Sequence, residues 1–163
     1  MVPRKRRTPS EGITWAVDPG KKSGLSIFID GEVIGIFAIP CLSFTQLLDI
    51  LQSRCLLNYL PNRLVLETQY KGRMSSWGSV VSVIRTRTVW ECVSDYLGCK
   101  EVNNINPSTW KKYWKIGRGK NRKKMSKDLA KRICPPQFAP KLTNDAAESY
   151  LIGRFLIENP DTP

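Results

Sequence analysis

The sequence predicts an α/β fold in which a mixed five-stranded sheet carries helices on both faces. Three β-rich runs follow one another within residues 13–39, and Asp30-Gly31, the dipeptide most typical of a two-residue hairpin, separates the second run from the third. Two further short apolar runs alternate with longer stretches that have helical spacing. We therefore expect three antiparallel strands first, followed by parallel strands that helices connect.

Local signals predict the elements of the first half. Gly24 is expected to belong to a break in the chain after the first strand. A helix is expected at residues 44–58, because Ser43 is a favourable N-cap and apolar residues then recur at helical spacing. Residues 63–67 form an apolar run too short for a helix, so they predict a buried strand, and this strand ends on the carboxylate of Glu67.

The second half begins with a long helix, predicted over residues 76–97 and closed by Gly98. Its content of Val and Thr is high for a helix, so a pair of strands remains an alternative there. Residues 101–107 predict another short strand. Three more helices are expected: a short one capped by Ser108, one over residues 125–133, and one over residues 145–159 that Thr143 or Asn144 caps.

Length and composition limit the possible classes of protein. With 163 residues and 41% hydrophobic residues, the chain can bury one core, so we expect a single domain at residues 12–158 between a flexible basic arm at residues 1–11 and a tail at residues 159–163. The five cysteines show no CxxC pair, which argues against a disulfide framework or a zinc knuckle. Histidine is absent, which excludes histidine bases and histidine metal sites. The sequence has no pattern of a signal peptide or a membrane span, so a cytoplasmic location is expected.

The charge balance predicts a polyanionic partner. The chain has 26 Lys and Arg against 14 Asp and Glu, a net charge of +12. Basic residues gather in the arm at residues 4–7 and above all in residues 111–132, the basic segment. Aromatic residues stand among these charges and favour nucleic acid over lipid, since aromatic side chains stack on bases; a solvated lysine-rich face is the alternative. These residues are Trp110, Tyr113 and Trp114.

Four acids predict a metal centre. Asp18 ends the first strand and Glu67 ends the fourth, so they project from the same edge if these strands are neighbours. Asp145 and Glu148 share one face at the start of the last helix. Four carboxylates together need cations, and oxygen ligands suit Mg²⁺ or Mn²⁺, two of which serve phosphodiester cleavage. The alternatives are that Asp18 opens a turn before Pro19 and that the helix acids only offset the helix dipole.

These pieces resemble the RuvC family of Holliday junction resolvases, within the RNase H-like superfamily. The matching segments are AVDPGKKSGLSIF, LVLE with an aromatic residue following at Tyr70, and TNDAAESYLIG, and the resemblance spans residues 13–157. It implies an RNase H-like fold and a crossover junction endodeoxyribonuclease with two Mg²⁺ or Mn²⁺ ions per active site. Such an enzyme resolves four-way junctions and related branched DNA by paired symmetric nicks.

The resemblance also implies roles for individual residues. Asp18, Glu67, Asp145 and Glu148 would be the catalytic acids that bind metal. Among the other residues, Lys123 or Lys124 would approach the scissile phosphate, Lys111 would match a basic position of the family, and Tyr70 would stack on bases at the junction centre. The rest of the basic segment is expected to hold DNA phosphates, through Lys112, Arg118, Lys120, Arg122 and Lys127.

Some features depart from the family pattern or leave alternatives open. Glu replaces Asp at position 148, the basic segment is unusually dense, and the arm is an addition, which together suggest a resolvase of phage or viral type acting in a bacterial or phage-infected cell. A nuclease of the RNase H type, a flap or branch nuclease, and an inactive nucleic-acid-binding module are the alternatives. A homodimer is expected, because two symmetric nicks require two sites and the helix at 76–97 is rich in apolar residues. These are Trp77, Val80, Val83, Ile84, Trp90 and Val93.

Overall fold

The computed structural model describes residues 12–40, 43–68 and 76–162. They form a five-stranded sheet with the order β3-β2-β1-β4-β5, in which β1 pairs antiparallel with β2 and β2 with β3, whereas β1, β4 and β5 run parallel. The predicted mixed sheet is therefore confirmed. The strands are β1 (Ile13–Asp18), β2 (Lys22–Ile29), β3 (Glu32–Pro40), β4 (Arg63–Glu67) and β5 (Glu101–Ile105).

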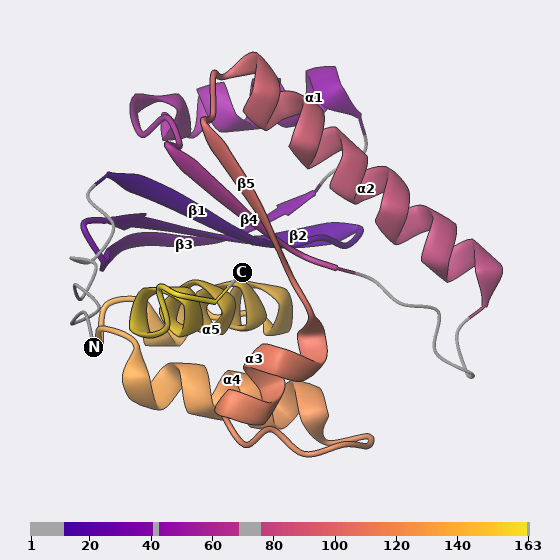
Figure 1. The fold of residues 1–163 in the computed structure, drawn as a ribbon, viewed down its shortest axis with the longest axis vertical. Coiled ribbons are helices and arrows are strands. Elements are labelled where there is room, and N and C mark those ends of the chain that lie inside the picture. Colours follow the sequence, from indigo (N-terminus) through magenta and orange to yellow (C-terminus); the bar gives the residue numbers. More distant parts are fainter. Residues whose placement is uncertain (1–11, 41–42, 69–75, 163) are drawn as a thin grey trace, which may run out of the picture.

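Helices cover both faces of the sheet, as predicted (Figure 1). On one side lie α1 and α2, and on the other α5 packs directly on the sheet with α3 and α4 beyond it. Among the described residues, no helix combines the length and the apolar character of a membrane span. The helices are α1 (Phe44–Ser53), α2 (Trp77–Tyr96), α3 (Pro107–Tyr113), α4 (Arg122–Ile133) and α5 (Asn144–Glu158), with the short 3₁₀ turns η1 (Leu56–Asn58) and η2 (Ala139–Lys141).

The hairpin between β2 and β3 forms where the sequence predicts it. Asp30 and Gly31 both have positive φ, 48° and 87°, as a two-residue turn of type I′ requires. The Asp30 carboxylate also accepts a hydrogen bond from the backbone N–H of Gly12, at 2.8 Å, which ties the turn to the start of β1.

Several of the predicted boundaries are wrong. The first helix ends at Ser53 and not at residue 58, because Cys55 takes a left-handed conformation with φ of 57°, which an α-helix cannot contain. Asn106, and not Ser108, caps α3, since the Asn106 side chain accepts the Ser108 N–H at 2.8 Å. Gly24 lies within β2 and not in a break before it.

The other uncertain elements are resolved by the structure. Residues 77–96 form one helix, so the alternative of two strands is excluded, and Gly98 follows its end with φ of 75°. The fourth helix begins at Arg122, one turn before the predicted residue 125. Thr143 caps α5 through its side chain, which accepts the N–H of Ala146.

The sheet separates two apolar cores, and alternation along the strands decides which face each residue serves. In β1, Trp15 and Val17 face the side of α1 and α2, whereas Ala16 belongs to the core under α5. In β4, Val65 also belongs to the core under α5, and Leu66 faces the opposite side. The residue two positions after Ala16 or Val65 therefore points toward α5.

Candidate active site and nucleic-acid interface

Two of the predicted acids stand side by side at the carboxyl edge of the sheet. Asp18 is the last residue of β1 and Glu67 the last of β4, and these strands are parallel neighbours whose register pairs Val17 with Leu66. By the alternation described above, both carboxylates point toward α5. Both are buried, with exposed fractions of 8% for Asp18 and 3% for Glu67.

The start of α5 brings the other two acids to this edge. Gly24 of β2 pairs with Asp18, and a Cβ atom at Gly24 would lie only 1.9 Å from the carbonyl oxygen of Asp145. A side chain at position 24 would thus exclude α5 from its place, so the glycine permits the close approach. Within this first part of α5, Glu148 is buried, whereas the Asp145 side chain is 32% exposed.

The other three acids lie near enough to Asp18 for their charges to act on it. Burial of Asp18 and the negative charges of Glu67, Glu148 and Asp145 raise the pKa of Asp18 well above its ordinary value of 3.8, and a side-chain hydrogen bond with Glu67 adds to this. Because burial is the largest cause, the raised pKa identifies a desolvated carboxyl group next to other acids. The structure thus brings together the four acids that the sequence predicts, and their catalytic role stays a prediction.

One of the carboxylates is held from α3. The Glu67 Oε1 atom accepts a hydrogen bond from the Trp110 indole Nε1, at 3.1 Å, and lies 3.2 Å from the Lys111 Nζ atom. The same Nζ atom lies 4.6 Å from the centre of the Trp110 ring. Lys111, which the sequence assigns to DNA, therefore binds an acid of the cluster in this structure.

A second set of contacts comes from α4. The Lys123 Nζ atom lies 4.0 Å from the Asp145 Oδ1 atom, and the Ser126 hydroxyl donates to the Glu148 Oε1 atom at 3.2 Å. The Lys123 side chain is 57% exposed, so this ion pair is weak and its ammonium group stays accessible to a phosphate.

The donor set fits a hard divalent cation. It consists of carboxylate oxygens without histidine or cysteine, which are the ligands of Mg²⁺ and Mn²⁺, and a cation would offset the repulsion between Asp18 and the neighbouring acids. Within residues 12–40, 43–68 and 76–162, no three acidic, cysteine or histidine side chains stand in the arrangement of a metal site. The acids are thus near enough to repel one another but not near enough to share a metal ion. Metal binding would draw the carboxylates closer together and displace Lys111 from Glu67.

The remaining basic residues that the sequence assigns to DNA gather around the connection between α3 and α4. They are exposed except for Lys127, which is half-buried, and Lys124 is exposed beside Lys123 in the first turn of α4. Tyr70 lies outside the described residues, so its predicted stacking role is not tested. The exposed residues are Lys112, Arg118, Lys120 and Arg122.

The interpretation of the tryptophans as base-stacking residues is wrong. Trp110 is fully buried, and Trp114 packs against the core under α5 while its indole N–H donates to the Leu151 carbonyl at 3.0 Å. Trp110 and Trp114 stand four residues apart, the spacing of one helix face, so they anchor this segment to the core.

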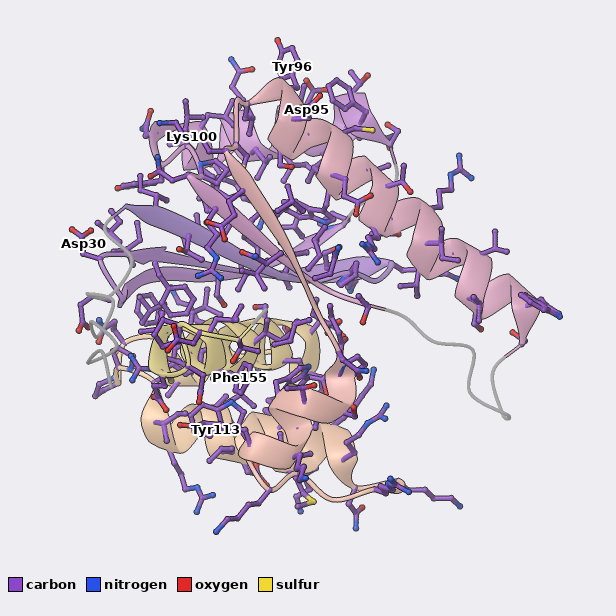
Figure 2. The ribbon with its side chains drawn as sticks, viewed as in Figure 1. Asp30, Asp95, Tyr96, Lys100, Tyr113 and Phe155 are labelled. Atoms are coloured by element: carbon purple, nitrogen blue, oxygen red, sulfur yellow. The ribbon has the colours of Figure 1, made fainter. Side chains whose placement is uncertain are left out.

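Tyr113 is the exposed aromatic residue of this group, at 42%. Its hydroxyl donates to the Glu158 Oε2 atom at 2.7 Å, and this hydrogen bond, with burial, raises the pKa of Tyr113. Its ring meets Phe155 edge-on with 5.1 Å between ring centres, where Figure 2 labels both residues. Tyr113 thus connects α3 to the C-terminal half of α5.

Sequence reasoning missed the contacts that Gly24, Ser126 and Trp110 make at this site. Gly24 is a glycine inside a strand, a signal for close backbone approach that the sequence does carry. Ser126 and Ala130 are small residues one turn apart in a lysine-rich helix, which indicates a face packed against another helix. The bond from Trp110 to Glu67 spans 43 residues, and no local pattern indicates it.

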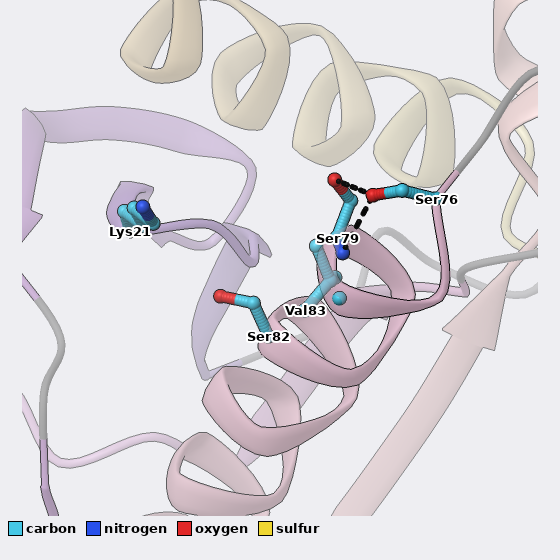
Figure 3. A pocket seen from close by; sticks show the side chains of 6 residues that line it. Lys21, Ser76, Ser79, Ser82 and Val83 are labelled. Atoms are coloured by element: carbon cyan, nitrogen blue, oxygen red, sulfur yellow. Dashed lines mark hydrogen bonds between the residues drawn. The ribbon is translucent and has the colours of Figure 1, made fainter.

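A pocket lies between Lys21, in the turn that follows Asp18, and the start of α2. Its volume is about 460 Å³, and Lys21 faces the first two turns of α2 across it (Figure 3). The serine hydroxyls of α2 line it, with Ser76 and Ser79 hydrogen-bonded to each other at 2.9 Å. None of the four acids belongs to its lining.

Comparisons with known proteins identify the fold. No family model matches the sequence, and no curated protein matches it either. Among solved structures, RuvC of T. thermophilus in complex with a Holliday junction substrate is similar, with a TM-score of 0.65 and 14% identity over 91% of this chain and 96% of that chain. A second structure of Thermus thermophilus RuvC has a TM-score of 0.61, also at 14% identity and the same coverage. The yeast mitochondrial Holliday junction resolvase Ydc2 has a TM-score of 0.55 and 15% identity over 94% of this chain and 80% of that chain. The predicted RNase H-like fold of the RuvC type is therefore confirmed.

Proposed function

We propose that this chain, which has the fold of RuvC, is a metal-dependent and structure-selective DNA endonuclease that resolves Holliday junctions and related branched DNA by paired symmetric nicks. The observation that carries the proposal is the cluster of four acids at one edge of the sheet, three of them buried, next to a helical layer dense in lysine and arginine. A solved neighbour of the same fold is a RuvC in complex with a Holliday junction substrate, which supports the choice of DNA.

The acid cluster would hold two Mg²⁺ or Mn²⁺ ions through Asp18, Glu67, Asp145 and Glu148. When bound, such ions supply an activated water and charge stabilisation for the cleavage of a phosphodiester bond. The chain itself supplies oxygen ligands, of which Asp18, Glu67 and Glu148 are buried. Two of these stand on adjacent strands, so their separation is fixed by the sheet.

The basic residues would offset the repulsion between this cluster and DNA. Lys123 lies 4.0 Å from Asp145 and is more than half exposed, so it can bind a phosphate next to the acids. Lys124 is exposed beside it. We propose that Lys123 and Lys124 approach the scissile phosphate and that the rest of the basic segment binds phosphates without reading bases.

The proposal is tested by cleavage of three substrates of the same sequence: a four-way DNA junction, a linear DNA duplex and an RNA–DNA hybrid, each with Mg²⁺ and with EDTA. We expect the junction alone to be cut, in two symmetrically placed strands, and only with Mg²⁺. Cleavage of the hybrid alone would identify an RNase H-type nuclease, since such an enzyme requires the 2′-hydroxyl. Junction binding without any cleavage would identify an inactive binding module.

We further propose that two copies act together on one junction. The N-terminal half of α2 exposes Trp77, Val81 and Ile84, at 66%, 59% and 51%, and these residues have the spacing of one helix face. Trp90 and Val93, on the other half, are buried within the subunit. A second copy would cover the exposed face and provide the second active site. Light scattering at micromolar concentration should give twice the monomer mass, and a fully active monomer would refute the dimer.

Tyr70 and the lysine pair should contribute to binding in different ways. Stacking of Tyr70 on a base is worth about 1–3 kcal/mol, and a junction centre offers unstacked base pairs whereas a linear duplex does not. Tyr70→Ala should therefore lower the ratio of junction affinity to duplex affinity without changing the salt dependence. Replacing Lys123 and Lys124 together by Gln should weaken binding to both DNAs alike and reduce its salt dependence. If Tyr70→Ala lowers only the melting temperature, its role is structural.

A further inference from the structure

Two buried side chains that belong to neither the acids nor the exposed basic residues each donate to one carboxylate of the cluster. We propose that Trp110 and Ser126 are positioning residues that fix the orientation of Glu67 and Glu148 toward divalent cations. This inference rests on the proposed function, because it assigns the two carboxylates to a metal site.

The contact from Trp110 is rigid. Its side chain is fully buried in the core that also contains Val65, two residues before Glu67 in β4. The indole Nε1 can only donate a hydrogen bond, and it lies 3.1 Å from the Glu67 Oε1 atom. Lys111 donates to the same oxygen, but its flexible side chain can leave, whereas the packed ring cannot. One oxygen of Glu67 is thereby fixed, and the carboxylate has a second oxygen for a cation.

The contact from Ser126 has the same form. Its side chain is fully buried, and its hydroxyl lies 3.2 Å from both the Glu148 Oε1 atom and the Arg122 carbonyl. The hydroxyl has a single hydrogen, so the two acceptors compete for it, and a carboxylate is the stronger acceptor. As with Glu67, the donor binds only one of the two carboxylate oxygens of Glu148.

The two donors come from the layer that carries the basic segment, whereas the acids come from the sheet and from α5. Trp110 lies in α3 and Ser126 in α4, so the helices that present lysines to DNA also orient the two buried glutamates. Partners of metal-ligating carboxylates set the direction of the ligand, and their loss commonly weakens metal affinity about 10–100-fold. A donor that only satisfied a buried oxygen would affect stability and leave metal affinity unchanged.

The experiment compares Trp110→Phe and Ser126→Ala with matched controls that lose a similar hydrogen bond away from the acids. Trp15 is also fully buried, and its indole donates to the Tyr59 carbonyl at 2.8 Å, so Trp15→Phe is the control for the first variant. Ser94 is buried in α2 and donates to the Glu91 carbonyl at 2.9 Å, so Ser94→Ala is the control for the second.

Binding of Mn²⁺ to the DNA-free protein, measured by isothermal titration calorimetry, is the main readout. We expect each test variant to bind Mn²⁺ about tenfold more weakly, and each control to stay within about twofold of the wild type. Junction cleavage should then need about tenfold more Mg²⁺ for half-maximal rate. Equal Mn²⁺ affinity in all variants, with melting temperatures lowered alike, would overturn the positioning role.

A measurement on the unmodified chain covers the case in which Trp110→Phe does not fold. In ¹H–¹⁵N spectra, the indole N–H resonance of Trp110 should shift when Mg²⁺ is added, while that of Trp15 should not. An unmoved Trp110 resonance in a protein that binds Mg²⁺ overturns the proposal. A wild-type protein that binds no Mn²⁺ and cuts no junction overturns the proposed function and this inference together, whereas unchanged variants of an active wild type overturn this inference alone.

Discussion

Replacement of Asp18 by Asn should stabilise the metal-free protein while it abolishes cleavage. Asn has almost the same shape as Asp, and its amide can donate to Glu67, so the variant removes one negative charge and little else. Asp18 is 8% exposed, and the two lysines that reach the cluster are bound to other acids, Lys111 to Glu67 and Lys123 to Asp145. Relief of this buried charge is worth about 1–3 kcal/mol, comparable to the desolvation penalty of a buried group.

The pH dependence gives the sign of this effect. The folded protein raises the pKa of Asp18 above its ordinary value of 3.8, so ionisation of Asp18 opposes folding. Below this value Asp18 is protonated in both the folded and the unfolded state, and wild type and variant should have similar stability. As the pH rises through the raised pKa, the wild type should lose stability relative to Asp18→Asn.

The assay combines thermal unfolding in EDTA at several pH values with junction cleavage in Mg²⁺. For a chain of this length, each kcal/mol corresponds to about 2–4 °C in Tm, so the gain is measurable at neutral pH. Loss of a metal ligand should slow cleavage about 1,000-fold, which corresponds to about 4 kcal/mol of transition-state stabilisation. Junction binding should persist, since the variant removes a charge that repels phosphate.

Asp95→Asn is the matched control, because it removes the same charge from an exposed position on α2. It should change neither Tm nor cleavage appreciably. If Asp18→Asn lowers Tm at neutral pH and junction binding is lost together with cleavage, Asp18 is a structural turn residue and the reasoning about a charged metal site is wrong.

Three further perturbations test the fold around the site. Gly24→Ala should destabilise the protein by about 1–3 kcal/mol and reduce junction cleavage, because the new Cβ atom would lie 1.9 Å from the backbone of α5. Gly78→Ala is the control, because the space around Gly78 is open, and it should leave junction cleavage unchanged. Tyr150→Phe removes the 3.1 Å hydrogen bond to the Ile133 carbonyl and should lower the free energy of urea unfolding at neutral pH by about 1 kcal/mol. Because burial raises the pKa of Tyr150 to about 12 from 10.0, the wild type alone should lose this contribution as the pH rises through that range. Parallel curves of unfolding free energy against pH for both proteins would contradict this. Ile84→Glu should give a monomer by light scattering with its Tm unchanged, and a persistent dimer would place the interface elsewhere.

Predictions from the sequence were most accurate where neighbouring residues decide the structure. The hairpin at Asp30-Gly31 needs only two residues that tolerate positive φ, and it forms as predicted. The predicted end of α1 is wrong because apolar spacing continues past Ser53, whereas the helix ends there and Cys55 takes a left-handed conformation. The tryptophans of the basic segment were misinterpreted because a tryptophan among lysines can stack on a base or fill a core, and composition does not distinguish the two.

The sequence by itself determined the strand ends that carry Asp18 and Glu67, the helix start that carries Asp145 and Glu148, and the excess of positive charge, since each is a property of a short stretch of chain. Only the tertiary structure decided how these pieces meet. It placed the backbone of α5 against Gly24 and set the indole of Trp110, 43 residues away in the chain, on Glu67. Such contacts depend on the packing of whole layers, and the period of a helix or a strand carries no information about which distant side chain will face a given carboxylate.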